Sequence, residues 1–185
     1  MKKNKRVLLL AAGLIIAFSA CKKDEKTVSP PVPGNEFLTT VQLVVTNNAD
    51  ATDTKTVAVK QLPGAAIDYS KATLTLKKNA VYTVAVKFLD ETTTPAGNVT
   101  DDIYDRRNYH LICFTISGGA NLTVTRTDKD TNIPPLEIGL QDNFTTGAAS
   151  TGSLNVQLRH QPNAKNGSCD PGSSDADVDF PVTIN

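Results

Sequence analysis

The sequence predicts an all-β protein, an antiparallel Ig-like β-sandwich of about eight or nine strands with one short helix. Two observations lead to this class. Most of the chain after residue 36 alternates apolar and polar side chains with a period of two, as half-buried strands do. Glycine, proline, asparagine or aspartate bounds each alternating segment, as expected for turns. Residues 37–185 suffice for one domain with its own core, so we expect a single sandwich domain.

The beginning of the chain has the composition of a secretory signal peptide. The basic start "MKKNKR" precedes the apolar run "VLLLAAGLIIAF", and the small residues Ser19 and Ala20 follow. This apolar run is shorter than the roughly 20 residues that span a bilayer comfortably. We therefore predict that residues 1–20 are a cleaved lipoprotein signal peptide, in preference to a permanent transmembrane anchor.

Cys21 follows the small pair directly, an arrangement that resembles a bacterial lipobox. We expect acylation of Cys21, because several acyl chains on one cysteine, each contributing about 0.8 kcal/mol per buried CH₂, hold a protein on a membrane. The alternative is a secreted protein whose cysteine is incidental. After the cysteine, residues 21–36 combine charged residues with three prolines and cannot bury enough surface to fold. We expect this segment to be a flexible tether.

The strands expected in the domain all show the period of two. In residues 81–89, "VYTVAVKFL", the side chains of Tyr82, Val84, Val86 and Phe88 would share one face. The other expected strands are residues 41–46, 56–60, 72–76, 109–116, 121–127, 136–140, 153–160 and 178–184.

One helix is expected within residues 100–107, "TDDIYDRR". Thr100 could cap its first turn, and Asp101 with Asp102 suits the positive end of the helix dipole. Arg106 and Arg107 suit the negative end. A helix of this length is a crossover between strands and not a second domain.

The two histidines of the chain occupy similar places. His110 begins one apolar stripe and His160 ends another, so antiparallel strands would bring them to the same end of the sandwich. Two imidazoles there could bind zinc or copper, with a carboxylate or water completing the shell. They could also serve as axial ligands of haem. The alternative is that both histidines hydrogen-bond loop carbonyls and bind nothing.

A second candidate site lies in "DKDTN", where Asp128, Asp130 and Asn132 have the opening spacing of a calcium loop. Ile133 stands where the glycine of such a loop belongs, and no glutamate closes the loop. An ordinary polar turn is the alternative.

A third acidic segment, "SDADVD", places aspartates at residues 175, 177 and 179. Their alternation predicts the solvent face of the last strand, with Val178 and Phe180 pointing inward.

The remaining thiols after acylation are Cys113 and Cys169. An oxidising compartment would favour a disulfide between them, and a buried free thiol at Cys113 is the alternative.

Several function classes lack support in the sequence. The basic residues of the signal peptide leave with it, and no basic patch remains that would indicate nucleic acid. Neither a Gly-x-Ser-x-Gly elbow, nor a His-Glu-x-x-His pair, nor a phosphate loop is present, so we expect no enzyme.

Several segments resemble a known group of proteins. The start "ACKKDE" resembles lipoproteins of the Bacteroidota, in which such residues after the cysteine direct export to the outer face of the outer membrane. The segments "NYHLICF", "TDKDTN" and "TTGAASTGSLNVQLRHQPNAKNG" resemble small lipoproteins of that phylum, sometimes labelled type 1 periplasmic binding domain proteins. The resemblance implies a surface-exposed lipoprotein of the cell envelope, with the periplasmic face as the alternative, serving a TonB-dependent uptake system.

The first hypothesis for function is therefore a non-catalytic binding module whose rim, with His110 and His160, holds a metal, haem or small nutrient. The alternative is a structural lipoprotein that contacts another envelope protein through an exposed strand edge.

Overall fold

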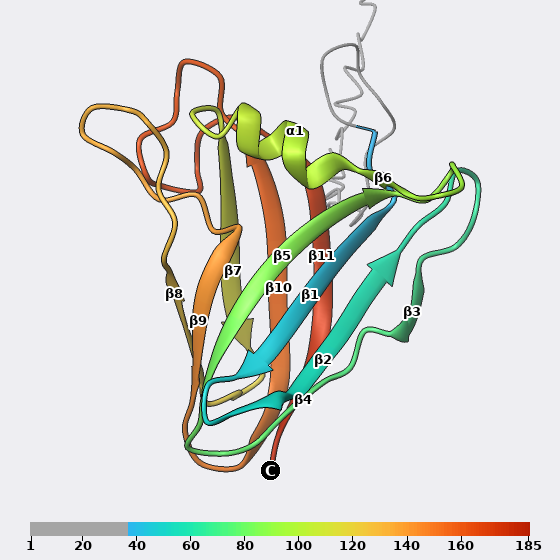
Figure 1. Ribbon diagram of the computed structural model, residues 1–185, viewed down its shortest axis with the longest axis vertical. Helices are drawn as coiled ribbons and strands as arrows, with labels where there is room; N and C mark the ends of the chain where they lie inside the picture. Colours follow the sequence, from blue (N-terminus) through green and yellow to red (C-terminus); the bar gives the residue numbers. More distant parts are fainter. Residues whose placement is uncertain (1–36) are drawn as a thin grey trace, which may run out of the picture.

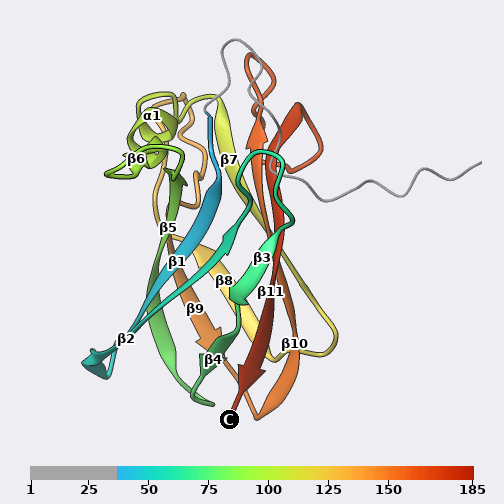
Figure 2. The same cartoon turned by 90° about the vertical axis from the view of Figure 1, so that its right-hand side faces the viewer.

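The computed structural model describes residues 37–185, and these residues form two β-sheets packed face to face (Figures 1 and 2). The predicted all-β class is confirmed: strands dominate and α1 is the single short helix of the described part. The signal peptide, Cys21 and the tether lie outside the described residues, and so stay predictions.

The larger sheet has seven strands, and neighbouring strands in it are antiparallel. Its strand order is β3-β2-β1-β5-β9-β8, and β6 pairs with β5 at one end. The bounds of its strands are β1 Thr40–Asn47, β2 Asp50–Lys60, β3 Asp68–Lys71, β5 Val81–Asp90, β6 Gly97–Asn98, β8 Leu122–Arg126 and β9 Gln141–Thr146.

The smaller sheet has four strands in the order β4-β11-β10-β7. Its pairs are antiparallel except for β4 with β11, which run parallel. The bounds of its strands are β4 Leu74–Leu76, β7 His110–Ser117, β10 Ser150–His160 and β11 Ser173–Ile184. This sheet carries both histidines, at the end of the sandwich where β7 begins and β10 ends.

Some expected strands were wrong in detail. Residues 136–140 form only an isolated bridge, Lys129 with Glu137, although Ile138 and Leu140 are buried. Strand β9 was missed because its inward residues include Asp142, which breaks the apolar alternation. Strand β3 was missed because all its side chains are exposed, and β6 because it is two residues long.

The core lies between the sheets and follows the predicted alternation. Tyr82, Val84 and Phe88 of β5 are fully enclosed, facing Leu154 and Leu158 of β10 in the opposite sheet. Removing such a side chain from water stabilises the fold by about 1.5–3 kcal/mol. The apolar stripes that the sequence shows are therefore the two inner faces of the sandwich.

Helix α1, Val99–Asp105, is shorter than expected and is capped differently. Asn98 is the cap, and its side chain accepts a hydrogen bond from the backbone N–H of Thr100. The hydroxyl of Thr100 instead donates to the carbonyl of Phe88 and accepts from its N–H, so it ties α1 to β5. The predicted role of Thr100 as cap was therefore wrong, and Arg106 and Arg107 follow the last turn rather than form it.

Several edges of the two sheets offer little room for strand addition. Strands β3 and β4 have four and three residues, and β3 carries charged side chains, a common protection against edge pairing. At the edge of β7, Ile112 donates its N–H to Ile138 and accepts a hydrogen bond from Arg126. Among residues 37–185, no helix is long and apolar enough to cross a membrane.

Candidate metal centre

The structure brings His110 and His160 together, as the strand parity predicts. They are direct partners in the antiparallel ladder between β7 and β10, because one begins its strand and the other ends its own. Their imidazole rings stack with 5.0 Å between centroids and 26° between planes. His110 is fully buried, whereas the side chain of His160 is 17% exposed. The pair is therefore enclosed on one side and open to solvent on the other.

Asp175 completes the cluster, although the alternation places it on the solvent face. In the ladder between β10 and β11, Leu158 pairs with Ala176 but Arg159 pairs with Ser174, so Asp175 is one extra residue on β11. Such a β-bulge turns a side chain to the other face of the sheet. Asp175 is 3% exposed and points inward, so the prediction of a solvent-facing aspartate was wrong at this position.

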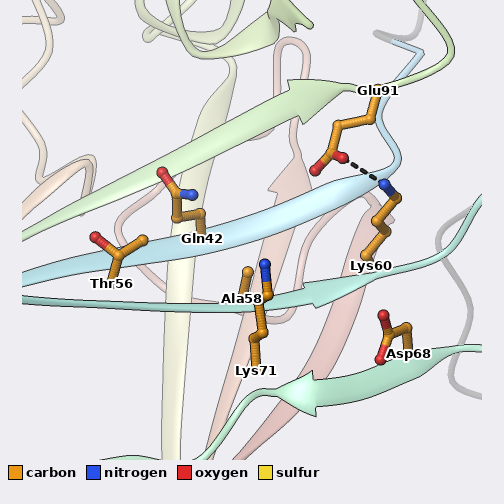
Figure 3. A pocket seen from close by; sticks show the side chains of 7 residues that line it. All are labelled: Gln42, Thr56, Ala58, Lys60, Asp68, Lys71 and Glu91. Carbon is orange, nitrogen blue, oxygen red and sulfur yellow. Dashed lines mark hydrogen bonds and ion pairs between the residues drawn. The ribbon is translucent and has the colours of Figure 1, made fainter.

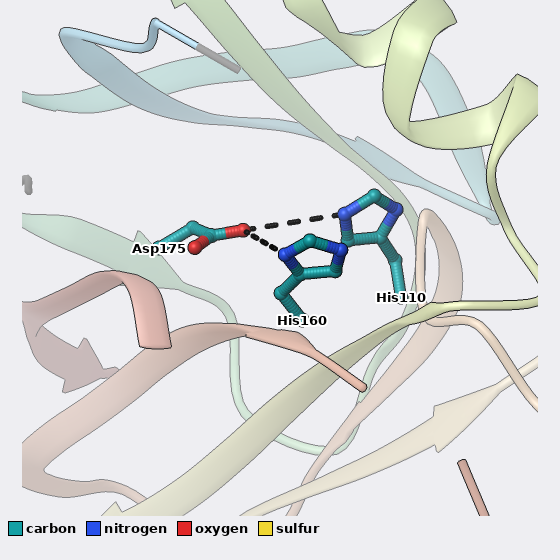
Figure 4. A group of neighbouring side chains, drawn as sticks. All are labelled: His110, His160 and Asp175. Carbon is teal, nitrogen blue, oxygen red and sulfur yellow. Dashed lines mark ion pairs between the residues drawn. The ribbon is translucent and has the colours of Figure 1, made fainter. Parts of the chain in front are cut away.

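The three side chains have the geometry of an open metal site (Figure 4). The Oδ2 atom of Asp175 lies 4.0 Å from Nε2 of His110 and 3.9 Å from Nδ1 of His160. All three candidate ligand atoms lie within 4.8 Å of one another. Ligand atoms around a tetrahedral zinc ion are about 3.3 Å apart, given Zn–N bonds of about 2.0–2.1 Å. Small side-chain movements would therefore suffice to bind one ion.

Haem does not fit this arrangement. Axial ligation places the porphyrin between two histidines, each on one side of the iron. Here the two rings stack against each other, and His110 has no exposed surface at which a macrocycle could enter. The nitrogen and oxygen donors suit a single zinc or copper ion instead.

The expected calcium loop is wrong, because its carboxylates are already occupied by protein groups. Asp128 accepts hydrogen bonds from the N–H groups of Gly139 and Leu140. Asp130 accepts from Asn132 and, at 2.8 Å, from the Nζ atom of Lys165. A lysine ammonium therefore stands where a cation would bind, and the segment is a structural polar turn.

Lys165 and Asp130 form a buried ion pair at the same end of the sandwich. Their side chains are 2% and 0% exposed, and Lys165 also donates to the carbonyl of Arg107. Burial would raise the pKa of Asp130, but hydrogen bonds from Lys165 and from two backbone N–H groups lower it overall. Burial lowers the pKa of Lys165, and Asp130 opposes that shift. The pair holds three loops at the rim: residues 106–109, 128–138 and 161–172.

Cys113 and Cys169 form a disulfide with 6.0 Å between their Cα atoms. Cys113 lies within β7, three residues after His110, and Cys169 lies in the loop that connects β10 to β11. The bond therefore ties the loop between β10 and β11 to β7, so it links the three strands that carry the candidate ligands. A disulfide of this kind is typical of proteins outside the cytoplasm.

Asp142 is a further buried carboxyl group, on the inner face of β9. It is fully enclosed, and neither carboxyl oxygen has a hydrogen-bond partner among the described residues. Burial raises the pKa of Asp142 to about 8; the charge of Asp128 adds to the rise and that of Arg126 opposes it. Asp142 is therefore largely protonated at neutral pH and is not part of the histidine cluster.

A polar hollow of about 330 Å³ lies on the outer face of β1, β2 and β3 (Figure 3). Its lining is Gln42, Thr56, Ala58, Lys60, Asp68, Lys71 and Glu91. The charges in it largely balance, and Lys60 forms an ion pair with Glu91, at the upper right of Figure 3. The hollow gathers neither histidine nor cysteine, so it offers no site comparable to the histidine cluster.

No protein-family model, no curated protein and no solved structure matches this chain. The functional argument therefore depends on the geometry of the cluster. Among its three residues, the sequence indicated His110 and His160 but not Asp175, whose position depends on a bulge that no sequence pattern marks.

Proposed function

We propose that this chain is a non-catalytic binding module of the cell envelope that holds a divalent transition-metal ion through His110, His160 and Asp175. One observation carries the proposal: three potential ligands from β7, β10 and β11 converge within 4.8 Å at one end of the sandwich. The two imidazoles and one carboxylate suit Zn²⁺ or Cu²⁺, whereas Ca²⁺ prefers a larger set of oxygen ligands.

The burial of the cluster supports a site for capture and release. His110 and Asp175 are enclosed, so an ion held there is shielded from water on its inner side. His160 is partly exposed and leaves a route from solvent. Three protein ligands leave the fourth position of a tetrahedral ion to water or to a group from a partner, and such an ion can exchange.

The location of the module in the cell is the second part of the proposal. We infer a lipid anchor at Cys21 on the outer membrane and service to a TonB-dependent uptake system, from the signal peptide and the resemblance described above. The disulfide between Cys113 and Cys169 is in keeping with an extracytoplasmic compartment. A Cys21→Ser variant should leave the membrane fraction, and its retention there would contradict the lipid anchor.

Thermal unfolding of residues 22–185, which lack the signal peptide and Cys21 and are freed of metal, tests the binding proposal. Increasing Zn²⁺ or Cu²⁺ should raise the melting temperature progressively, because a ligand at 100 times its Kd stabilises the folded state by about 2.7 kcal/mol. Ca²⁺ at the same concentrations should have no effect. A melting temperature that is unchanged by both transition metals would refute the proposal.

Two aspartates of β11 provide a matched pair of variants. Asp175→Asn keeps the shape of the side chain but removes the charged ligand, so the shift caused by Zn²⁺ should be lost. Asp177→Asn alters a side chain that bonds to Asn155 and Gln157 in the same sheet, away from the cluster, and should leave that shift intact. The quantity compared is the change in melting temperature when Zn²⁺ is added to each variant. This comparison separates metal binding from any direct effect of the substitution on stability. Equal shifts in both variants would exclude Asp175 as a ligand.

A further inference from the structure

The turn that leads into β11 comes directly before the bulge that turns Asp175 inward. Gly172 ends this turn with a φ of +81°, and a Cβ atom there would collide with the carbonyl oxygen of His160. The chain therefore passes directly against the end of β10 before the bulge begins. The path of residues 170–172 sets where Asp175 starts and which way it turns.

Arg159 holds this turn from β10. Its Nη2 atom donates hydrogen bonds to three successive carbonyls, at 3.1 Å to Asp170, 3.1 Å to Pro171 and 2.8 Å to Gly172. Hydrogen bonds from a charged donor are stronger than neutral ones. Arg159 is also the backbone partner of Ser174, so it lies beside the bulge itself.

We propose that Arg159 is a positioning residue for the metal centre, which fixes Asp175 through the turn and the bulge. This inference rests on the proposed metal-binding function. Gln161 supports the same turn, because its Nε2 atom donates to the carbonyls of Ser168 and Pro171. The Nε atom of Arg159 is buried and has no acceptor among residues 37–185. Burying that donor without an acceptor carries a cost, which the three hydrogen bonds from Nη2 have to offset.

The expected loss of zinc affinity can be taken from other residues that orient metal ligands without binding the metal themselves. Their loss typically lowers metal affinity 10- to 100-fold. Without the guanidinium, the carbonyls of Asp170 and Gly172 would bond to water and Gln161 alone would hold the turn at Pro171, so Asp175 would lose its fixed orientation. Zinc binding would then also have to order the turn, and this cost would weaken the affinity.

The experiment is a zinc titration of residues 22–185, carried out well below the melting temperature with a competing chelator. Arg159→Met keeps an unbranched stem of the side chain and removes every donor, and we expect its Kd to rise about 10-fold or more. Arg159→Lys keeps a charged donor and should bind within about 3-fold of the wild type, because Lys can still donate to these carbonyls. The visible spectrum of bound Co²⁺ should change in Arg159→Met and not in Arg159→Lys.

Thr146→Val is the control for a general loss of stability. The hydroxyl of Thr146 donates to the carbonyls of Lys77 and Ala80 at the other end of the sandwich, so the variant should be less stable but bind Zn²⁺ normally. Unchanged affinity in Arg159→Met would overturn the positioning role while leaving the metal site intact. Equal losses in Arg159→Met and Thr146→Val would overturn it as well. A wild type that binds no Zn²⁺ refutes the proposed function, and the inference fails with it.

Discussion

Replacing Asp142 by asparagine should make the stability of the domain much less dependent on pH. The carboxyl group of Asp142 has a pKa of about 8 in the folded protein, against an ordinary value of 3.8. In the unfolded chain it ionises near its ordinary pKa. The folded state therefore keeps a proton that the unfolded state loses, and this contribution to stability is complete below about pH 4 and is lost as the pH rises through about 8.

The magnitude follows from the size of the shift. One pKa unit corresponds to about 1.4 kcal/mol, so the contribution of Asp142 to the free energy of unfolding should fall by about 3 kcal/mol between pH 5 and pH 7.5. The asparagine side chain of the variant would not titrate. The other titratable groups are common to the two proteins and cancel in the comparison. Asp142→Asn should therefore gain about 3 kcal/mol relative to the wild type over this pH interval.

Urea denaturation at pH 5 and pH 7.5, followed by circular dichroism, measures this difference. The slope of the free energy with urea should be the same in both proteins, since the same surface is exposed on unfolding. Asp177→Asn, which changes an aspartate on the outer side of β11, is the control and should follow the wild type. If the wild type and Asp142→Asn lose the same stability between the two pH values, the burial argument is refuted.

Two further predictions concern the links that hold the rim. Lys165→Met should lower the free energy of unfolding, measured by urea denaturation, by about 3–5 kcal/mol because it leaves Asp130 charged and buried. A second change, Asp130→Leu, should recover most of that loss. A Lys165→Met variant as stable as the wild type would show that the pair is not buried. The Cys113→Ser/Cys169→Ser variant should lose about 4 kcal/mol of unfolding free energy, which is the loop-closure value for a sequence separation of 56. Reduction of the wild type by a phosphine should lower its stability by the same amount. Equal stability of the oxidised and reduced protein would contradict this value.

The parts of the fold that the sequence predicts are those governed by local alternation. The stripe through Tyr82 and Phe88 needed only a period of two to be assigned to the core. The same parity, with antiparallel pairing, was enough to bring His110 and His160 to one end. These predictions hold because the period of two is continuous along each of these strands.

The parts that could not be predicted depend on interruptions or on distant residues. One inserted residue turns Asp175 to the opposite face, and a period-two pattern carries no mark of where an insertion falls. The calcium spacing of Asp128 and Asp130 gave the wrong result because Lys165, far along the chain, occupies the carboxylate. The cap of α1 was missed because Thr100 bonds to β5 instead of to its own helix.

The chain enters the domain at the end of the sandwich that carries the candidate metal centre. Thr39 bonds to the end of β5, and β1 starts at the same end of the sandwich at which β10 finishes, whereas the C-terminus lies at the far end (Figures 1 and 2). If Cys21 is acylated as we propose, the tether would attach the domain to the membrane through the end that carries His160. The candidate metal centre would then lie at the anchored end of the domain, and the C-terminus at the end farthest from the anchor.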